Sequence, residues 1–342
     1  MNTRRSLFIF VVASIPLINS CNSGSQTAKK VSAQGVRQEQ EQEANKKKLE
    51  DLNHDYSRVP DAMILDDGDG TLLYTELKKR YKDDAAKLKQ LVEASGAKLV
   101  FVILTPNEGT GNPNNKRYGT PVITATCAQL GIECVDFSPI VARQDVHVIS
   151  QIPKDGHWSK KGAEFIASLM APIITKYSSV TSTVTYKDSE RPETFGDLAP
   201  SSDEILDGGK DMPYHVIANS QGVRMDHDVK FPKKKKHVLL MGDSGIFCPF
   251  LNNEFIISNV LQKQFPDAEI MNTGMICYTL EDYVTLWNEK AKFSEPDLVI
   301  VQTNGGDITD YFFTNRNHLS RSHKPFLPSP NEEAFYKKKY PM

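Results

Sequence analysis

One stretch constrains the fold of this chain more than any other: His237-Val238-Leu239-Leu240-Met241-Gly242-Asp243-Ser244-Gly245. Short apolar runs bounded by glycine are typical of strands buried inside a parallel sheet. In open α/β sheets the chemistry lies just beyond the carboxyl ends of the strands. Ser244 therefore stands where a nucleophile would be, although Asp and Ser at this point also suit an ordinary helix N-cap.

Similar apolar runs recur along the chain and alternate with helical patterns. We predict strands at residues 62–65, 98–105, 132–135, 268–271 and 297–302. We predict helices at residues 72–95, 121–130, 255–265 and 280–292, and one that begins near Ser159. Strands that alternate with helices indicate an α/β fold, a doubly wound and mainly parallel sheet with helices on both faces. This is a three-layer αβα architecture.

The net charge and the distribution of apolar residues limit the kinds of partner that we expect for this protein. The chain has 342 residues and a formal net charge of −2, which argues against bulk attraction to nucleic acid. Beyond the N-terminus, the sequence contains no apolar stretch of the length that a spanning helix needs. We expect a globular protein without nucleic-acid partners.

The N-terminus predicts export. Arg4 and Arg5 precede an apolar run from Leu7 to Ile18, which suits a signal-peptide core and is too short to span a bilayer. The run ends in Leu17-Ile18-Asn19-Ser20-Cys21, which resembles a bacterial lipobox. The resemblance implies a signal peptide over 1–21, lipid on Cys21 and anchoring to a membrane of the bacterial cell envelope, in the periplasm or at the outer membrane. A plain secretory signal remains the alternative.

Residues 22–58 are polar and contain few apolar side chains to bury, so we predict a tether. Four cysteines follow, and export makes disulfides possible. Their spacing resembles no zinc site, and we expect neither a metal nor another cofactor. Cys248 and Cys277 each follow a candidate active-site turn and could pair; free thiols at Cys127, Cys134, Cys248 and Cys277 are the alternative.

Chemistry-bearing residues follow three predicted strands and one further loop. Ser244, Gly274 and Asn304 come after strands, and Asp155 and His157 lie in a loop before a helix. Acyl transfer requires a serine activated by a base, a carboxylate that orients the base, and donors for the developing oxyanion. The chain contains each of these groups.

These motifs resemble those of the SGNH (GDSL) hydrolases. Gly242-Asp243-Ser244 resembles the first block of that family, and Asn272-Thr273-Gly274 resembles the second. Asp155-Gly156-His157-Trp158 is similar to the last block, in the form found in domains that acetylate or deacetylate bacterial polysaccharides. The stretch from Asn219 to Arg224 resembles the segment that precedes the first block in many bacterial members.

The resemblance implies a function and a set of roles. Ser244, His157 and Asp155 would form the catalytic triad, and the N–H groups of Ser244 and Gly274, with Asn304, would form the oxyanion hole. The substrate would be an ester-bearing glycan, with O-acetyl groups foremost, or a small-molecule ester. Hydrolysis and transfer use the same triad, so both remain open. Trp158 is either a core anchor or a platform for a sugar.

The order of the blocks departs from the family, in which the Asp-His block comes last. Residues 59–177 resemble the second half of such a domain, and residues 213–342 contain the first half and a tail, with a linker at 178–212. Circular permutation would give one composite domain over 59–342, since domain termini often lie close together. An exchange of halves between two chains is the alternative. In the permuted arrangement we expect the tether to emerge near the active-site face.

The third block departs as well. It usually reads Gly-x-Asn-Asp, and its Asn donates to the oxyanion. Gly306 holds that position here, and Asn304 lies two residues earlier. Loss of one oxyanion donor typically lowers the rate by about 100- to 1,000-fold, so a non-catalytic carbohydrate-binding or scaffold lipoprotein of the same fold is one alternative.

A phosphatase is the other alternative. Asp67-Gly68-Asp69-Gly70-Thr71-Leu72 after an apolar run resembles the nucleophile motif of haloacid-dehalogenase-type phosphatases. Asp67 would then be the nucleophile, Asp69 the acid/base and Mg²⁺ the cofactor, with Thr105 as the second motif. Asp/Gly clusters are also common as plain turns.

Overall fold

The computed structural model describes residues 70–104, 119–207, 211–305 and 307–308. The predicted signal peptide, the tether and the strand at 62–65 lie outside the described residues. So does residue 59, on which the predicted position of the tether depends. Among the described residues, no helix has both the length and the apolar character needed to cross a bilayer.

Five parallel strands form the central sheet, in the order β2-β1-β7-β5-β6. Their bounds are β1 (Lys98–Ile103), β2 (Glu133–Asp136), β5 (Lys236–Met241), β6 (Ala268–Asn272) and β7 (Leu298–Thr303). β1 and β7 pair from Lys98 with Leu298 to Ile103 with Thr303. The two segments of the chain therefore share one continuous sheet, although they are far apart in sequence.

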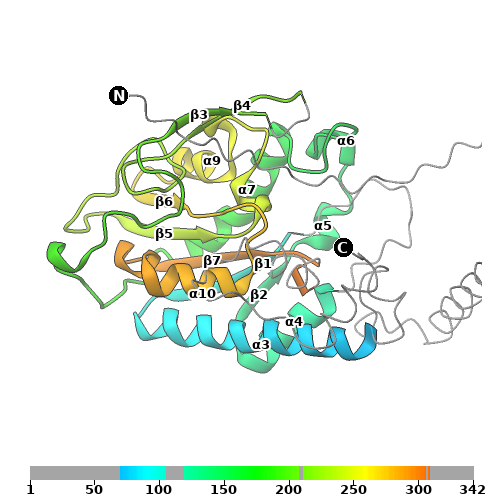
Figure 1. Ribbon diagram of the computed structural model, residues 1–342, viewed down its shortest axis with the longest axis horizontal. Coiled ribbons are helices and arrows are strands. Elements are labelled where there is room, and N and C mark those ends of the chain that lie inside the picture. The colour runs from blue at the N-terminus through cyan, green and yellow to red at the C-terminus, as the bar shows by residue number, and fades with distance from the viewer. Residues whose placement is uncertain (1–69, 105–118, 208–210, 306, 309–342) are drawn as a thin grey trace, which may run out of the picture.

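Helices cover both faces of this sheet (Figure 1). One face carries α3 (Gly70–Ala94), α4 (Gly119–Leu130) and α10 (Leu280–Glu289); the other carries α7 (Lys160–Lys176) and α9 (Ile257–Gln264). Successive strand residues point to opposite faces, so Leu239 and Met241 join one core while Val238 and Leu240 join the other. The predicted three-layer α/β fold is confirmed.

Shorter elements lie between these layers or over them. They are α5 (Ser138–Val141), α6 (Val146–Ile149), α8 (Ser244–Phe247), the 3₁₀ turns η2 (Asp188–Glu190), η3 (Asn253–Phe255) and η4 (Ala291–Ser294), and the antiparallel pair β3 (Asp203–Leu206) and β4 (Tyr214–Ile217). β3 falls within the segment predicted as a linker. Its Asp203 and Glu204 are exposed, so it lacks the apolar run that marks a buried strand.

Candidate active site

The carboxyl ends of three neighbouring strands meet at the candidate site. β5 lies between β7 and β6 in the sheet, which places Ser244 between Asn304 and Gly274. The Asn304 Nδ2 atom donates to Asp243 Oδ2 over 2.8 Å. On the other side, Met275 N donates to Gly242 O over 3.0 Å. The structure thus brings all three predicted strand-end residues to one edge of the sheet.

The turn that carries Ser244 is tightly packed. Asp243 is the N-cap of α8, and its Oδ1 accepts from Gly245 N over 2.7 Å. A Cβ placed on Gly242 would lie 2.5 Å from Ile246 Cγ1, and one placed on Gly245 would lie 2.8 Å from Gln302 Oε1. Only glycine allows approaches this close. Ser244 is therefore presented at the first position of α8 by a turn with no spare volume.

Gln302 supports this turn and was missed by the sequence reasoning. It lies on β7, its side chain is buried, and its amide lowers the pKa of the Asp243 carboxyl. Burial raises the pKa of Asp243, and the contacts with Gly245 N–H, the His157 charge, Gln302 and Asn304 oppose this rise. The apolar strand pattern gives no signal for such a role, since Gln302 reads as the polar end of a strand.

The loop before α7 holds the predicted base and carboxylate. His157 N donates to Asp155 Oδ1 over 2.8 Å, and His157 Nδ1 contacts the same oxygen. The Asp155 side chain is 5% exposed and that of His157 is 34% exposed, so the carboxylate is buried behind an accessible ring. With Nδ1 engaged by Asp155, Nε2 is the ring nitrogen left for acid–base work.

The helix that follows this loop is capped by another residue. Ser159 is the N-cap of α7, and its side chain accepts from Gly162 N over 3.1 Å. His157 is instead paired with Asp155.

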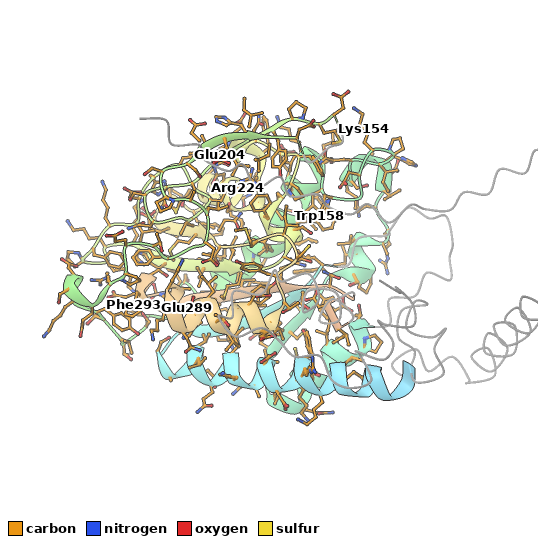
Figure 2. The ribbon with its side chains drawn as sticks, in the orientation of Figure 1. Lys154, Trp158, Glu204, Arg224, Glu289 and Phe293 are labelled. Carbon is orange, nitrogen blue, oxygen red and sulfur yellow. The ribbon has the colours of Figure 1, made fainter. Side chains whose placement is uncertain are left out.

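The histidine loop docks directly on the serine turn. Trp158 Nε1 donates to Gly245 O over 3.1 Å, and Gln151 Nε2 donates to Pro249 O over 3.2 Å. Trp158 is 2% exposed and points into the interior (Figure 2). It is therefore a core anchor and not a sugar platform. Between the described side chains of Ser244 and His157 there is no direct hydrogen bond; such contacts often tighten only when substrate binds.

Arg224 organises the segment that follows α8 and was recognised in the sequence only as part of a lead-in motif. It is fully buried, among the side chains in the interior of Figure 2. Burial lowers its pKa to about 10. Its five N–H groups all have acceptors: Asn253 Oδ1 and the carbonyl oxygens of Phe247, Cys248, Leu251 and His215. Four of these acceptors lie between residues 247 and 253.

The same segment contains two residues in the left-handed region. Cys248 has φ 57° and Phe250 has φ 63°. Such conformations are costly for residues other than glycine and persist where surrounding contacts enforce them. The Phe250 ring lies 6.1 Å from the His157 ring, between their centroids. Arg224 thus holds in place the segment that lies beside the candidate base.

The three predicted oxyanion donors differ in their present partners. Gly274 N–H donates to Asn272 Oδ1 over 2.9 Å, within its own turn. Asn304 donates to Asp243. Among the described residues, Ser244 N–H has no acceptor. Gly274 and Asn304 are thus both engaged by side chains of the site in this structure.

Other predicted chemistry receives less support from the structure. The four described cysteines are free thiols, with Cys248 buried and Cys277 exposed, so the pair that could have formed is not joined. Across the described ranges, no group of three or more His, Cys, Asp or Glu side chains could hold a metal ion. Cys21 and the phosphatase residues Asp67, Asp69 and Thr105 lie outside the described residues.

Comparison with known proteins gives similarities to solved structures only. No protein-family model matches the chain. No curated protein matches it either. The O-acetyltransferase domain of Pseudomonas putida AlgJ is 14% identical, with a TM-score of 0.41 over 78% of this chain and 91% of that one. Pseudomonas aeruginosa AlgX is 17% identical, with a TM-score of 0.38 over 66% of this chain and 56% of that one. Bacillus cereus PatB1 is 9% identical, with a TM-score of 0.39 over 69% of this chain and 91% of that one. At these identities, the site itself has to carry any assignment of function.

Proposed function

We propose that this chain is an exported serine esterase or O-acyltransferase of the SGNH type. It acts on ester groups, with O-acetyl groups foremost, of an envelope glycan or a similar ester. The observation that carries the proposal is the docking of a paired His157 and Asp155 on the turn that presents Ser244.

Each residue of the proposed triad has a role that follows from its position. His157 Nε2 takes the proton from Ser244 Oγ, and Ser244 attacks the ester carbonyl. The buried Asp155 holds the tautomer with Nδ1–H and stabilises the imidazolium that forms. His157 then returns the proton to the departing alcohol. Water or a sugar hydroxyl releases the acyl group from Ser244 by the reverse sequence of steps.

The proposed substrate class is supported by a sequence motif, and the proposed domain organisation is supported by the pairing of strands in the sheet. The resemblance of Asp155-Gly156-His157-Trp158 to domains that act on polysaccharide acetyl groups supports a glycan ester. The pairing of β1 with β7 supports one composite, circularly permuted domain over 59–342. We propose that lipid on Cys21 anchors this domain to the membrane of the envelope.

A non-catalytic glycan-binding or scaffold lipoprotein is the second candidate. The observation that favours it is the Gly274 N–H, which already donates to Asn272. Such a protein would bind glycan equally well with Ser244 replaced.

Labelling with a fluorophosphonate probe tests the proposal. The full chain is compared with Ser244→Ala and His157→Ala, and with two exposed matched controls, Ser220→Ala and His147→Ala. We expect labelling to vanish in Ser244→Ala, to fall at least about 1,000-fold in His157→Ala, and to persist in both controls. If folded wild-type protein takes no label, the proposal is contradicted. The non-catalytic glycan-binding or scaffold lipoprotein is then the remaining candidate.

A further inference from the structure

We propose that Asp243 is a positioning residue that orients Asn304 as an oxyanion donor, in place of the usual third-block Asn. The inference rests on the proposed function and explains how the site works with Gly306 at that third-block position. It also assigns Asp243 a role beyond that of a helix cap.

The need for a donor follows from the partners at the site. An oxyanion on a substrate bound to Ser244 requires donors about 2.7–3.1 Å away. Ser244 N–H, at the start of α8, can supply one of them. Gly274 N–H is occupied by Asn272 Oδ1. Asn304 follows the neighbouring strand β7 and brings a side-chain NH₂ group, with two N–H bonds, to the same edge of the sheet.

The direction of the Asn304 amide is set by chemistry. In the structure Asn304 presents its NH₂ group, not its oxygen, to Asp243 Oδ2, as an accepting carboxylate oxygen requires. That NH₂ group has two N–H bonds in one plane, and binding of the first fixes the direction of the second. Asp243 directly precedes Ser244 in the chain, so this bond joins the Asn304 amide to the turn that presents the nucleophile.

The Asp243 carboxylate is itself firmly held. Its Oδ1 accepts from Gly245 N over 2.7 Å, and its Oδ2 accepts from Asn304 over 2.8 Å. One carboxylate therefore anchors both the helix that begins at Ser244 and the amide of Asn304. A plain N-cap needs only the Gly245 contact, which a serine side chain would also make.

This difference allows a direct test. Asp243→Ser keeps an N-cap oxygen for Gly245 N–H but lacks the second oxygen that holds Asn304. Asp243→Ser, Asn304→Ala and the double variant are compared with the wild-type full chain. Asp145→Ser is the matched control, because Asp145 is the N-cap of α6 and accepts from His147 N over 2.9 Å.

The measurement is the rate of fluorophosphonate labelling at several probe concentrations, which separates the maximal rate of inactivation from the apparent dissociation constant. All proteins are labelled at the same pH and ionic strength, so that the rates differ only through the substitutions. Urea unfolding of each variant confirms that it is folded.

We expect the maximal rate to fall about 100-fold or more in Asp243→Ser and by a similar factor in Asn304→Ala. The apparent dissociation constant should stay within about twofold, because the oxyanion contact strengthens in the transition state. The double variant should be no more than about threefold slower than either single variant, because both remove one interaction. Asp145→Ser should label like the wild type.

Two results would overturn the inference while the proposed function stands. One is an Asp243→Ser protein that labels at the wild-type rate; the other is a double variant whose loss is the product of the two single losses. Absence of label in folded wild-type protein would instead reject the proposed function and this inference together.

Discussion

The serine turn and the histidine loop contribute to the same candidate site but are held in place differently. The serine turn is fixed from within: glycines pack against β7 and α8, Asp243 caps α8, and the buried Arg224 binds the carbonyls that follow. The histidine loop is closed by its own hydrogen bonds, such as Gln151 N to His157 O, and is joined to the turn by side chains of Trp158 and Gln151 that donate to main-chain oxygens. The two regions therefore differ mainly in packing: the turn is tightly packed, and the loop is held by hydrogen bonds.

The glycines of the two regions show the same contrast. A Cβ on Gly242 would lie 2.5 Å from Ile246 Cγ1, whereas a Cβ on Gly156, between Asp155 and His157, would have nothing within 4 Å. The serine turn has no tolerance for added volume, and the histidine loop has room. Substitutions should therefore damage the turn through packing and the loop through lost hydrogen bonds.

Replacement of Arg224 should have the largest effect. Arg224→Met leaves several buried carbonyl oxygens without donors, and each such acceptor typically costs about 1–3 kcal/mol, or at least about 3 kcal/mol together. We expect the free energy of unfolding in urea to fall by this amount and fluorophosphonate labelling to fall with it. The exposed Arg143 is the control: Arg143→Met should change stability by less than about 0.5 kcal/mol. Equal stability of the two variants would contradict the role assigned to Arg224.

A pair of glycine substitutions sharpens the comparison. Gly242→Ala forces its new methyl group against Ile246 and Gln302, and overpacking of this kind costs about 1–3 kcal/mol. Gly156→Ala meets open space and should stay within about 0.5 kcal/mol of wild type. Urea midpoints of the two variants, measured side by side, check the difference. A Gly156→Ala protein as unstable as Gly242→Ala would show that the two regions are equally packed.

Loss of the docking hydrogen bond should be milder. Trp158→Phe keeps a buried ring but leaves Gly245 O without its indole donor, which we expect to cost about 1–2 kcal/mol. This bond joins the histidine loop to the serine turn. The rate at which the probe labels Ser244 should therefore fall by a larger factor than the fraction of folded protein does. The comparison is with Trp287→Phe, a buried tryptophan of α10 on the other face of the sheet, which should lose stability without a specific loss of labelling.

The smallest effect concerns pH at the amino end of β5. Burial lowers the pKa of His237, although the hydrogen bond to Ser294 O opposes this. In the unfolded chain this histidine takes up a proton near pH 6.5, whereas in the folded protein it does so only at lower pH. The neutral, buried His237 therefore contributes its full stability above about pH 6.5, and this contribution is lost as the pH falls below that value. We expect the free energy of unfolding to fall by at most about 1.4 kcal/mol per pH unit from this group.

A variant isolates that contribution. His237→Asn can keep a donor for Ser294 O but does not titrate, so its urea midpoint should depend less on pH between about 7.5 and 5.5 than that of the wild type. An unchanged pH dependence would assign the acid sensitivity to other groups.

The sequence by itself determined the layers of this protein. Apolar runs such as Val238–Met241 and Leu298–Val301 are buried on both faces, and this pattern alone predicts strands of a parallel sheet. Helix starts were readable where a local signal exists, as at Ser159 before α7. β3 was missed because its exposed acidic residues carry no such signal.

Only the tertiary structure decided which side chains act together at the candidate site. The contacts that define it join residues 61, 87 and 98 positions apart: Asn304 with Asp243, Trp158 with Gly245, and Gln151 with Pro249. Sequence pattern reports local periodicity and caps, whereas these bonds depend on the order of the strands in the sheet. That order sets Asn304 beside Asp243 and Gly274 on the other side of the turn, and it is fixed by packing between segments that are distant in the chain.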